Sequence, residues 1–113
     1  MKVRGTSLSM IRGDTETLTV ACQNTAGEAV PFVAGDIVYF TVKKSVKDEE
    51  KALQKIVTDF LEGEAIIEIY PEDTKHLNFG EYVYDVQLTK ANGDIFTIVP
   101  ASDFNIEGEV TYE

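Results

Sequence analysis

The sequence predicts an all-β fold, an antiparallel sandwich of about seven to eight strands that forms one domain over residues 1–113. Short runs of alternating apolar and polar residues recur along the chain, and turns that contain Gly, Asn or Pro separate them. A corner pattern begins at Leu77, and the pair Asn92 and Gly93 predicts a β-hairpin. The hydrophobic share of 43% is sufficient for one buried core.

The first two predicted strands lie before residue 24. Residues 8–11 are expected to form an edge strand that ends in a turn at Arg12, Gly13 and Asp14. The Arg-Gly-Asp triplet also occurs in integrin ligands, but so short a match is uninformative, and we interpret it as a turn. Residues 17–23 form the next predicted strand, and the residues on its apolar face are Leu18, Val20 and Cys22.

The middle of the chain predicts three further strands. Residues 37–44 are expected to form a strand at the centre of a sheet. The inward residues of this strand are Val38, Phe40 and Val42, and the outward residues are Tyr39, Thr41 and Lys43. Residues 52–57 follow a charged loop, and their β-branched members favour a strand over a helical turn. The strand at residues 65–70 has the inward residues Ala65, Ile67 and Ile69.

A short helical turn and a corner are predicted next. Pro71 suits the first position of a helix, and the acidic residues after it favour the amino end of that helix. Leu77, Gly80 and Tyr82 then form the pattern of a tyrosine corner, in which a Tyr hydroxyl binds to backbone just upstream. This corner is typical of immunoglobulin-like sandwiches, so we expect a fold of that type.

The last predicted feature is an antiparallel hairpin. Residues 81–90 are expected to pair with residues 94–100 through the turn at Asn92 and Gly93. The inward residues of the first hairpin strand are Tyr82, Tyr84, Val86 and Leu88. The run that begins at Phe104 is expected either to extend the sheet or to leave it towards a partner.

Composition excludes several classes of function. The net charge is −10, which disfavours nucleic acid and anionic membranes as partners. Cys22 is the only cysteine and His76 the only histidine, which is a poor inventory for catalysis. We expect no enzyme activity, no cofactor and no bound metal. No long apolar run and no signal-peptide pattern occurs, so we expect synthesis and folding in a cytoplasm.

The candidate functional residues lie on the outward face of the predicted strands, where a partly apolar surface is typical of protein binding. They are Tyr39, Thr41, Val83, Asp85, Gln87, Thr97 and Val99. Unpaired edge strands offer a second route, since their backbone groups can accept a partner strand. A carbohydrate-binding or adhesin module is the alternative, with Tyr39 as the aromatic ring that would contact a sugar.

Segments spread over most of the chain resemble an immunoglobulin-like module of tailed phages and prophages. The similar segments are Ile11-Arg12-Gly13-Asp14-Thr15, Phe40-Thr41-Val42-Lys43, Pro71-Glu72-Asp73-Thr74 and Gly80-Glu81-Tyr82-Val83-Tyr84-Asp85-Val86-Gln87-Leu88. The segments are similar to the amino-terminal domain of baseplate upper proteins, where a Gly-Asp-Thr start and a Gly-x-Tyr-x-Tyr-Asp block frame a β-sandwich.

The resemblance implies a structural protein of the virion that is made in the bacterial cytoplasm. Its implied partners are other phage structural proteins, and a homo-oligomer is a further expectation. A free-standing tail, head-decoration or adaptor protein is an equal expectation, because the regions that follow in baseplate upper proteins are not in this sequence. In the general immunoglobulin pattern, Cys22 would take the place of the first disulfide cysteine and Tyr84 that of the second.

Overall fold

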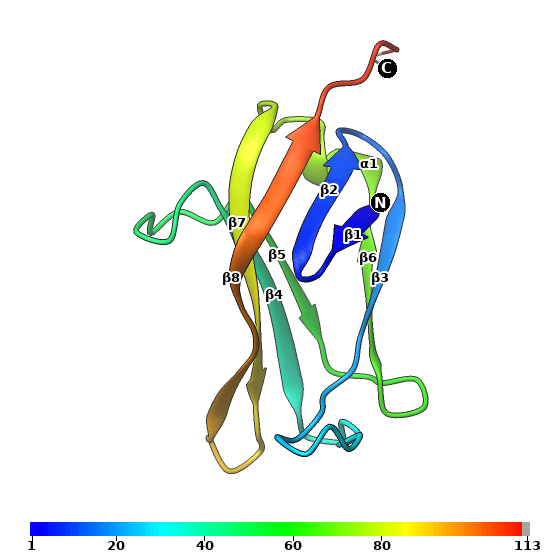
Figure 1. The fold of residues 1–113 in the computed structure, drawn as a ribbon, viewed down its shortest axis with the longest axis vertical. Helices are drawn as coiled ribbons and strands as arrows, with labels where there is room; N and C mark the ends of the chain where they lie inside the picture. Colours follow the sequence, from blue (N-terminus) through cyan, green and yellow to red (C-terminus); the bar gives the residue numbers. More distant parts are fainter. Residues whose placement is uncertain (112–113) are drawn as a thin grey trace.

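Two β-sheets pack face to face in the computed structural model, which describes residues 1–111, with backbone only for residues 2–4 (Figure 1). The large sheet contains, in spatial order, β1 (Lys2–Arg4), β2 (Ser7–Ile11), β8 (Ile95–Glu107), β7 (Gly80–Thr89), β4 (Ile37–Lys43) and β5 (Leu53–Val57). The small sheet contains β3 (Glu16–Val20) and β6 (Ala65–Ile69). A short helix, α1 (Pro71–Thr74), connects β6 to the corner before β7.

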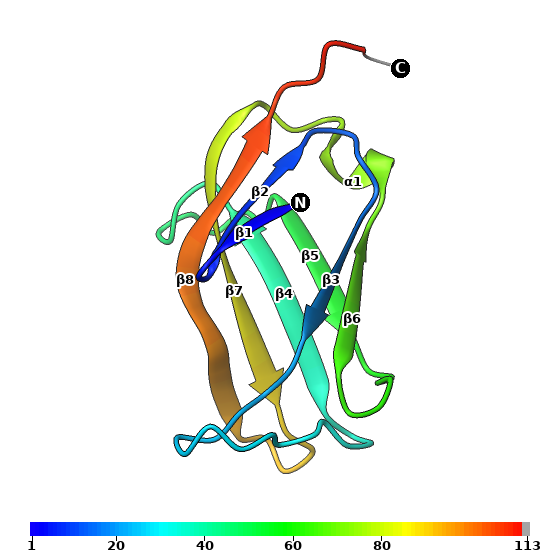
Figure 2. The same cartoon turned by 45° about the vertical axis from the view of Figure 1, so that its right-hand side comes forward.

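The all-β, immunoglobulin-like sandwich predicted from sequence is confirmed. Figure 2 shows β3 and β6 at the right of the molecule and β8, β7 and β4 of the large sheet to their left. Every neighbouring pair is antiparallel except β2 and β8, whose pairing is parallel. The sheet is therefore mixed rather than purely antiparallel, which is possible because β2 and β8 lie near opposite ends of the chain and need no tight turn between them.

The alternation of β4, β6 and β7 places their apolar residues in the core as predicted. Phe40, Tyr84 and Phe104 are buried and form a cluster with ring centroids 5.4–6.1 Å apart. Ile67 and Ile69 of β6 are buried from the small sheet. β5 also forms a strand as predicted, and β4 lies between β5 and β7, the central place expected for it.

Residues 8–11 do not form the edge strand that the sequence predicted. β1 pairs with β2 on its outer side, with Val3 opposite Leu8, and β8 pairs with β2 on its inner side. The apolar alternation of β2 reflects this position, since Leu8 and Met10 are buried. The edges of the large sheet are therefore β1 and β5.

β8 is one long strand that includes both the hairpin arm and the run from Phe104. Its pairing with β7 shifts twice: Tyr84 lies opposite Ser102 and Val86 opposite Val99, and then Gln87 lies opposite Thr97. Each shift inserts one extra residue in β8, which is the definition of a β-bulge. The simple alternation assumed for residues 94–100 therefore fails in this part of the strand.

The β7–β8 hairpin turns where the sequence predicted. The Gly93 N–H donates to the Lys90 carbonyl at 2.9 Å, and the Lys90 N–H donates to the Asp94 carbonyl at 2.8 Å. Gly93 has a φ of 95°, a region that favours glycine. The hairpin therefore has the three-residue type of loop, with Gly93 at its third position. It does not have the two-residue loop in which Asn-Gly pairs are most frequent.

Ion pairs link the two layers at both edges. The Met1 amino group lies 2.7 Å from a Glu16 carboxylate oxygen on β3, and Lys55 Nζ of β5 lies 2.7 Å from Asp73 of α1. At the end of the sandwich near the hairpin, buried Asp36 accepts from Lys90 at 2.9 Å. It also accepts from the Val33 N–H at 3.0 Å.

Candidate interaction surface

The tyrosine corner has the hydrogen bond that its pattern requires. The Tyr82 hydroxyl donates to the Asn78 carbonyl at 2.9 Å, and the ring is buried. Leu77 packs against the core, and its N–H donates to the Thr74 carbonyl at 2.9 Å. Gly80 has a φ of 133°, so a side chain there would be strained. These contacts fix the start of β7 and hence the register of its outward residues.

Most of the predicted binding residues lie side by side on one surface. We name it the outer face, the side of the large sheet that points away from the small sheet. In one row of the sheet Tyr39 lies opposite Gln87, which lies opposite Thr97. In the next row Thr41 lies opposite Asp85, and beyond it Val83 pairs with Lys43. All are half-buried except Thr97, which is exposed.

Val99 does not belong to the outer face, so this part of the prediction is wrong. The bulge at Ile98 places Val99 opposite Val86, a fully buried inward residue. Val99 consequently packs against the core. A one-residue shift moves a strand residue to the opposite face of its sheet, and this is what the bulge does here.

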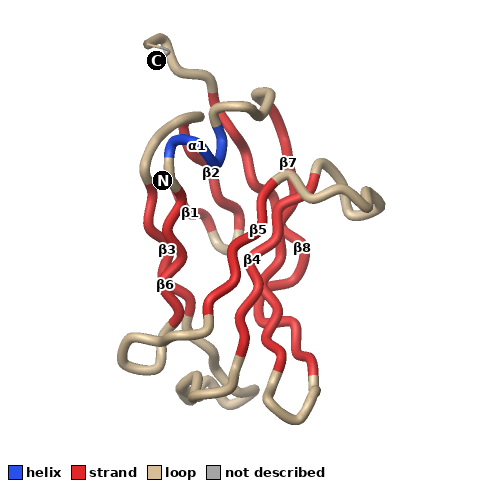
Figure 3. The backbone as a smooth tube through the Cα atoms, turned by 180° about the vertical axis from the view of Figure 1, so that it is seen from behind, coloured by secondary structure: helices blue, strands red, loops and turns tan. Residues whose placement is uncertain are grey.

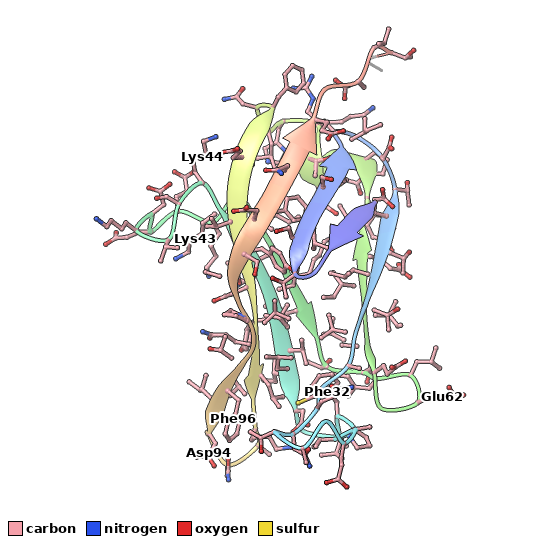
Figure 4. All side chains as sticks on the ribbon, in the orientation of Figure 1. Phe32, Lys43, Lys44, Glu62, Asp94 and Phe96 are labelled. Carbon is pink, nitrogen blue, oxygen red and sulfur yellow. The ribbon has the colours of Figure 1, made fainter. Side chains whose placement is uncertain are left out.

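A shallow groove of about 80 Å³ lies in the outer face. Its lining residues are Thr41, Lys43, Val46, Val83, Tyr84, Asp85 and Ala101. The loop at residues 44–51 projects from the sheet beside this groove, as Figure 3 shows from behind and Figure 4 shows near Lys43 and Lys44. The outer face is therefore walled on one side by the projecting loop, and Val46 of that loop is 67% exposed.

Asp85 gives the groove a carboxylate in a partly apolar setting. Burial raises the pKa of the Asp85 carboxyl, and the positive charge of Lys43 offsets part of that rise. Thr41, its neighbour across the ladder, accepts a hydrogen bond from Gln54 Nε2 at 3.0 Å. A docked surface would therefore meet a carboxylate flanked by valines, a lysine and an ordered hydroxyl–amide pair.

Four residues of this surface were not predicted from the sequence. Gln54 and Ile56 of β5 lie opposite Thr41 and Tyr39, and Ile56 is 57% exposed. The alternation of β5 would have indicated that Gln54 and Ile56 lie on the outer face, if the pairing of β5 with β4 had also been predicted. Val46 and Ala101 carried no such signal, because a loop and a bulge bring them to the groove.

The other residues weighed from sequence lie elsewhere. His76 is exposed. The Arg12-Gly13-Asp14 segment is a turn: the Asp14 N–H donates to the Ile11 carbonyl, and Arg12 is held by Glu109 at 2.7 Å. It does not present an extended arginine as a ligand would.

Cys22 and Tyr84 do not occupy the two places of an immunoglobulin disulfide. Cys22 lies beyond the end of β3 and lines a groove with Pro31 and Gly63. Tyr84 lines a different groove, and the β3 residues that share it are Leu18, Thr19 and Val20. The Tyr84 hydroxyl instead donates to the Thr6 carbonyl, which ties β7 to the turn between β1 and β2.

Within residues 1–111, no group of three or more His, Cys, Asp or Glu side chains comes together as metal ligands would. No helix in that part of the chain is long and apolar enough to cross a membrane. Comparison with protein-family models and with curated proteins gives no match to this chain. A proposal about function therefore depends on the fold, the outer face and the resemblance of its segments to phage modules.

Proposed function

We propose that this chain is a non-enzymatic, protein-binding component of a tailed phage or prophage particle, and that its outer face docks another structural protein of the particle. The observation that carries the binding role is the outer face itself. Its row from Ile56 through Tyr39 and Gln87 to Thr97 contains no charged residue, in a chain whose residues are 27% charged.

The composition of the face supports protein as its partner. Interaction surfaces are depleted of charge at their centre and carry a few polar groups that set the register of the partner. Gln87 and Thr41 provide such polar groups between Tyr39 and Val83, and Asp85 and Lys43 provide two opposite charges at the groove. The phage assignment rests on the resemblance of the Gly80–Leu88 block and the other segments, and it implies a place in the virion after synthesis in the host cytoplasm.

A photo-crosslinking residue at Gln87 tests this proposal in cells that produce the particles. We expect Gln87 to crosslink to a particle protein and the chain to be present in purified, intact particles. The matched control is the same residue at Thr17, which is exposed on the opposite side of the sandwich, in β3. Equal crosslinking from Thr17, or absence of the chain from intact particles, would contradict the proposal.

The carbohydrate-binding alternative gains no specific observation from the structure. Tyr39 is half-buried in its row, and the exposed rings of Tyr70, Phe79 and Phe96 lie on different elements. Glycan sites present rings that a sugar can stack on, so the decisive measurement is a sugar titration in which Tyr39→Ala removes saturable binding.

A further inference from the structure

The hairpin half of β8 has a strand partner on one side only. β7 pairs with β8 from Ile106 to Ile95, but β2 pairs with it only from Phe104 to Glu107. Within the described residues, no strand pairs with the far side of residues 95–103. In Figure 2 this half of β8 forms the left margin of the molecule, with β7 beside it.

This free edge is apolar and uncharged. Ile95 is 63% exposed and Phe96 is 54% exposed. No charged residue occurs between Asp94 and Asp103, in a chain of net charge −10. An exposed apolar edge of this kind presents unpaired N–H and C=O groups that another strand can bind.

An apolar groove of about 190 Å³ opens beside the same edge. Its walls include Leu8, Leu18, Val20, Tyr84, Val86 and Val99, from both sheets. β1 and β2 cover the core only beside the other half of β8. Of the apolar side chains that line the groove, Leu18 and Val99 are half-buried, whereas Leu8, Tyr84 and Val86 are buried. Every residue that lines the groove is uncharged, and a charged side chain that entered it would lose its hydration without gaining a partner.

We propose that residues 95–99 and this groove form an acceptor site for an extended, uncharged strand of a partner protein, whose alternate apolar side chains enter the groove. The backbone edge would give affinity, and the groove would select the side chains. Five residues of β-strand span about 17 Å. Pro100 lacks an N–H, so it ends the stretch that can pair, and the bulge at Ile98 makes the pairing within that stretch irregular.

A second copy of this chain is a poorer occupant than a foreign strand. Each copy carries a net charge of −10, so two copies repel one another. An identical edge would also bring the same bulges and the same Pro100 to the pairing. Natural edges use bulges and proline to block self-association. A neutral, regular foreign strand is not repelled, and it adds no bulge or proline to those that β8 already has.

This site is distinct from the proposed function, because it uses a sheet edge and an inter-sheet groove and shares only Thr97 with the outer face. The two inferences are therefore tested separately. Failure of the Gln87 crosslink would contradict the proposed function but not the acceptor site. Failure of strand binding would contradict the acceptor site but not the proposed function.

The test uses the whole chain and a short synthetic peptide in which Thr and Val alternate between terminal lysines. We expect saturable binding below about 1 mM. Amide exchange should slow at residues 95–99, and Leu18 and Val86 should show chemical-shift changes. The matched control peptide has the same sequence with alternate backbone amides methylated on the pairing edge, and it should not bind.

Two variants place the site on β8. Phe96→Glu should weaken the peptide at least about tenfold, although its charge alone would attract the lysines. Leu61→Glu adds the same charge at comparable exposure, 65% against 54%, in the turn before β6 and outside both proposed sites, and should leave affinity within about twofold. Circular dichroism checks that both variants fold.

Several results would overturn the proposal. They are no binding at about 1 mM, equal binding of the methylated peptide, protection centred on β5, or equal losses in the two variants. Sedimentation of the chain alone as a dimer with protected residues 95–99 would also overturn it, because the occupant would then be a second copy.

Discussion

The Tyr82 hydroxyl reaches back four residues to the Asn78 carbonyl and closes the corner before β7. Tyr82→Phe removes this hydrogen bond and keeps the ring, so we expect the free energy of unfolding to fall by about 1 kcal/mol. Urea denaturation measures the change. Tyr39→Phe on the outer face is the control and should change stability by less than about 0.5 kcal/mol. An unchanged midpoint in Tyr82→Phe would show that the corner bond contributes nothing to stability.

Asp36 makes stability depend on pH. Burial alone would raise the pKa of its carboxyl, but the Val33 N–H and Lys90 lower it, and the net shift is downward. A group with a lowered folded-state pKa stabilises the fold above its unfolded pKa, about 3.9 for Asp, and that contribution is lost as the pH falls through the folded-state pKa.

Asp36→Asn should therefore destabilise the protein by about 1–2 kcal/mol at pH 7 and by less at about pH 3. Chemical denaturation at the two pH values measures the difference. Asp94→Asn, at an exposed hairpin residue, serves as the control. A difference between wild type and Asp36→Asn that stays constant with pH would contradict the role of this carboxylate.

At the scale of elements, the hairpin depends on the backbone of Gly93. Its φ is 95°, and a Cβ atom added at this residue would meet no heavy atom of the described chain within 4 Å, apart from its chain neighbours. Gly93→Ala therefore adds backbone strain without a clash, and we expect a loss of about 1 kcal/mol. Gly93→Asn should lose less, since Asn tolerates positive φ. Equal losses in thermal denaturation would contradict strain as the cause.

The strands that alternate regularly were predictable from sequence, and the irregular ones were not. In β4, β6 and β7 burial follows alternate residues, so the apolar pattern indicated both the strand and its inward face. The bulges of β8 follow from how β7 pairs with it, which no local pattern records. That is why simple alternation assigns Val99 to the wrong face and its neighbour Thr97 to the correct one.

The candidate surface was predictable to the same extent. Tyr39, Thr41, Asp85 and Gln87 belong to regular, adjacent strands, so their alternation placed them on one face. The wall of the groove depends on Val46 in a loop, whose path is set by tertiary packing. The parallel pairing of β2 with β8 was also beyond sequence reasoning, because it joins residues nearly a chain length apart.

For the whole molecule, the charge imbalance of 20 acidic and 10 basic residues opposes compaction. Salt at about 0.1 M screens charges beyond about 10 Å, so the urea midpoint should rise between about 10 mM and about 150 mM NaCl. Glu49→Lys with Glu50→Lys, both exposed in the projecting loop, changes the net charge from −10 to −6. This double variant should show a smaller rise, and an equal rise would contradict the charge explanation.

The parallel pairing of β2 with β8 also determines when the large sheet can be completed. Leu8 is made near the start of synthesis, but its partner Phe104 is made near the end. A nascent chain on the ribosome can pair β3 with β6 and β4 with β5 earlier, while β2 must wait for almost all of the chain to emerge. Closing so long a loop is slow. The side of β2 that pairs with β8 stays open until the end of synthesis, so it is the segment that a chaperone would meet during translation.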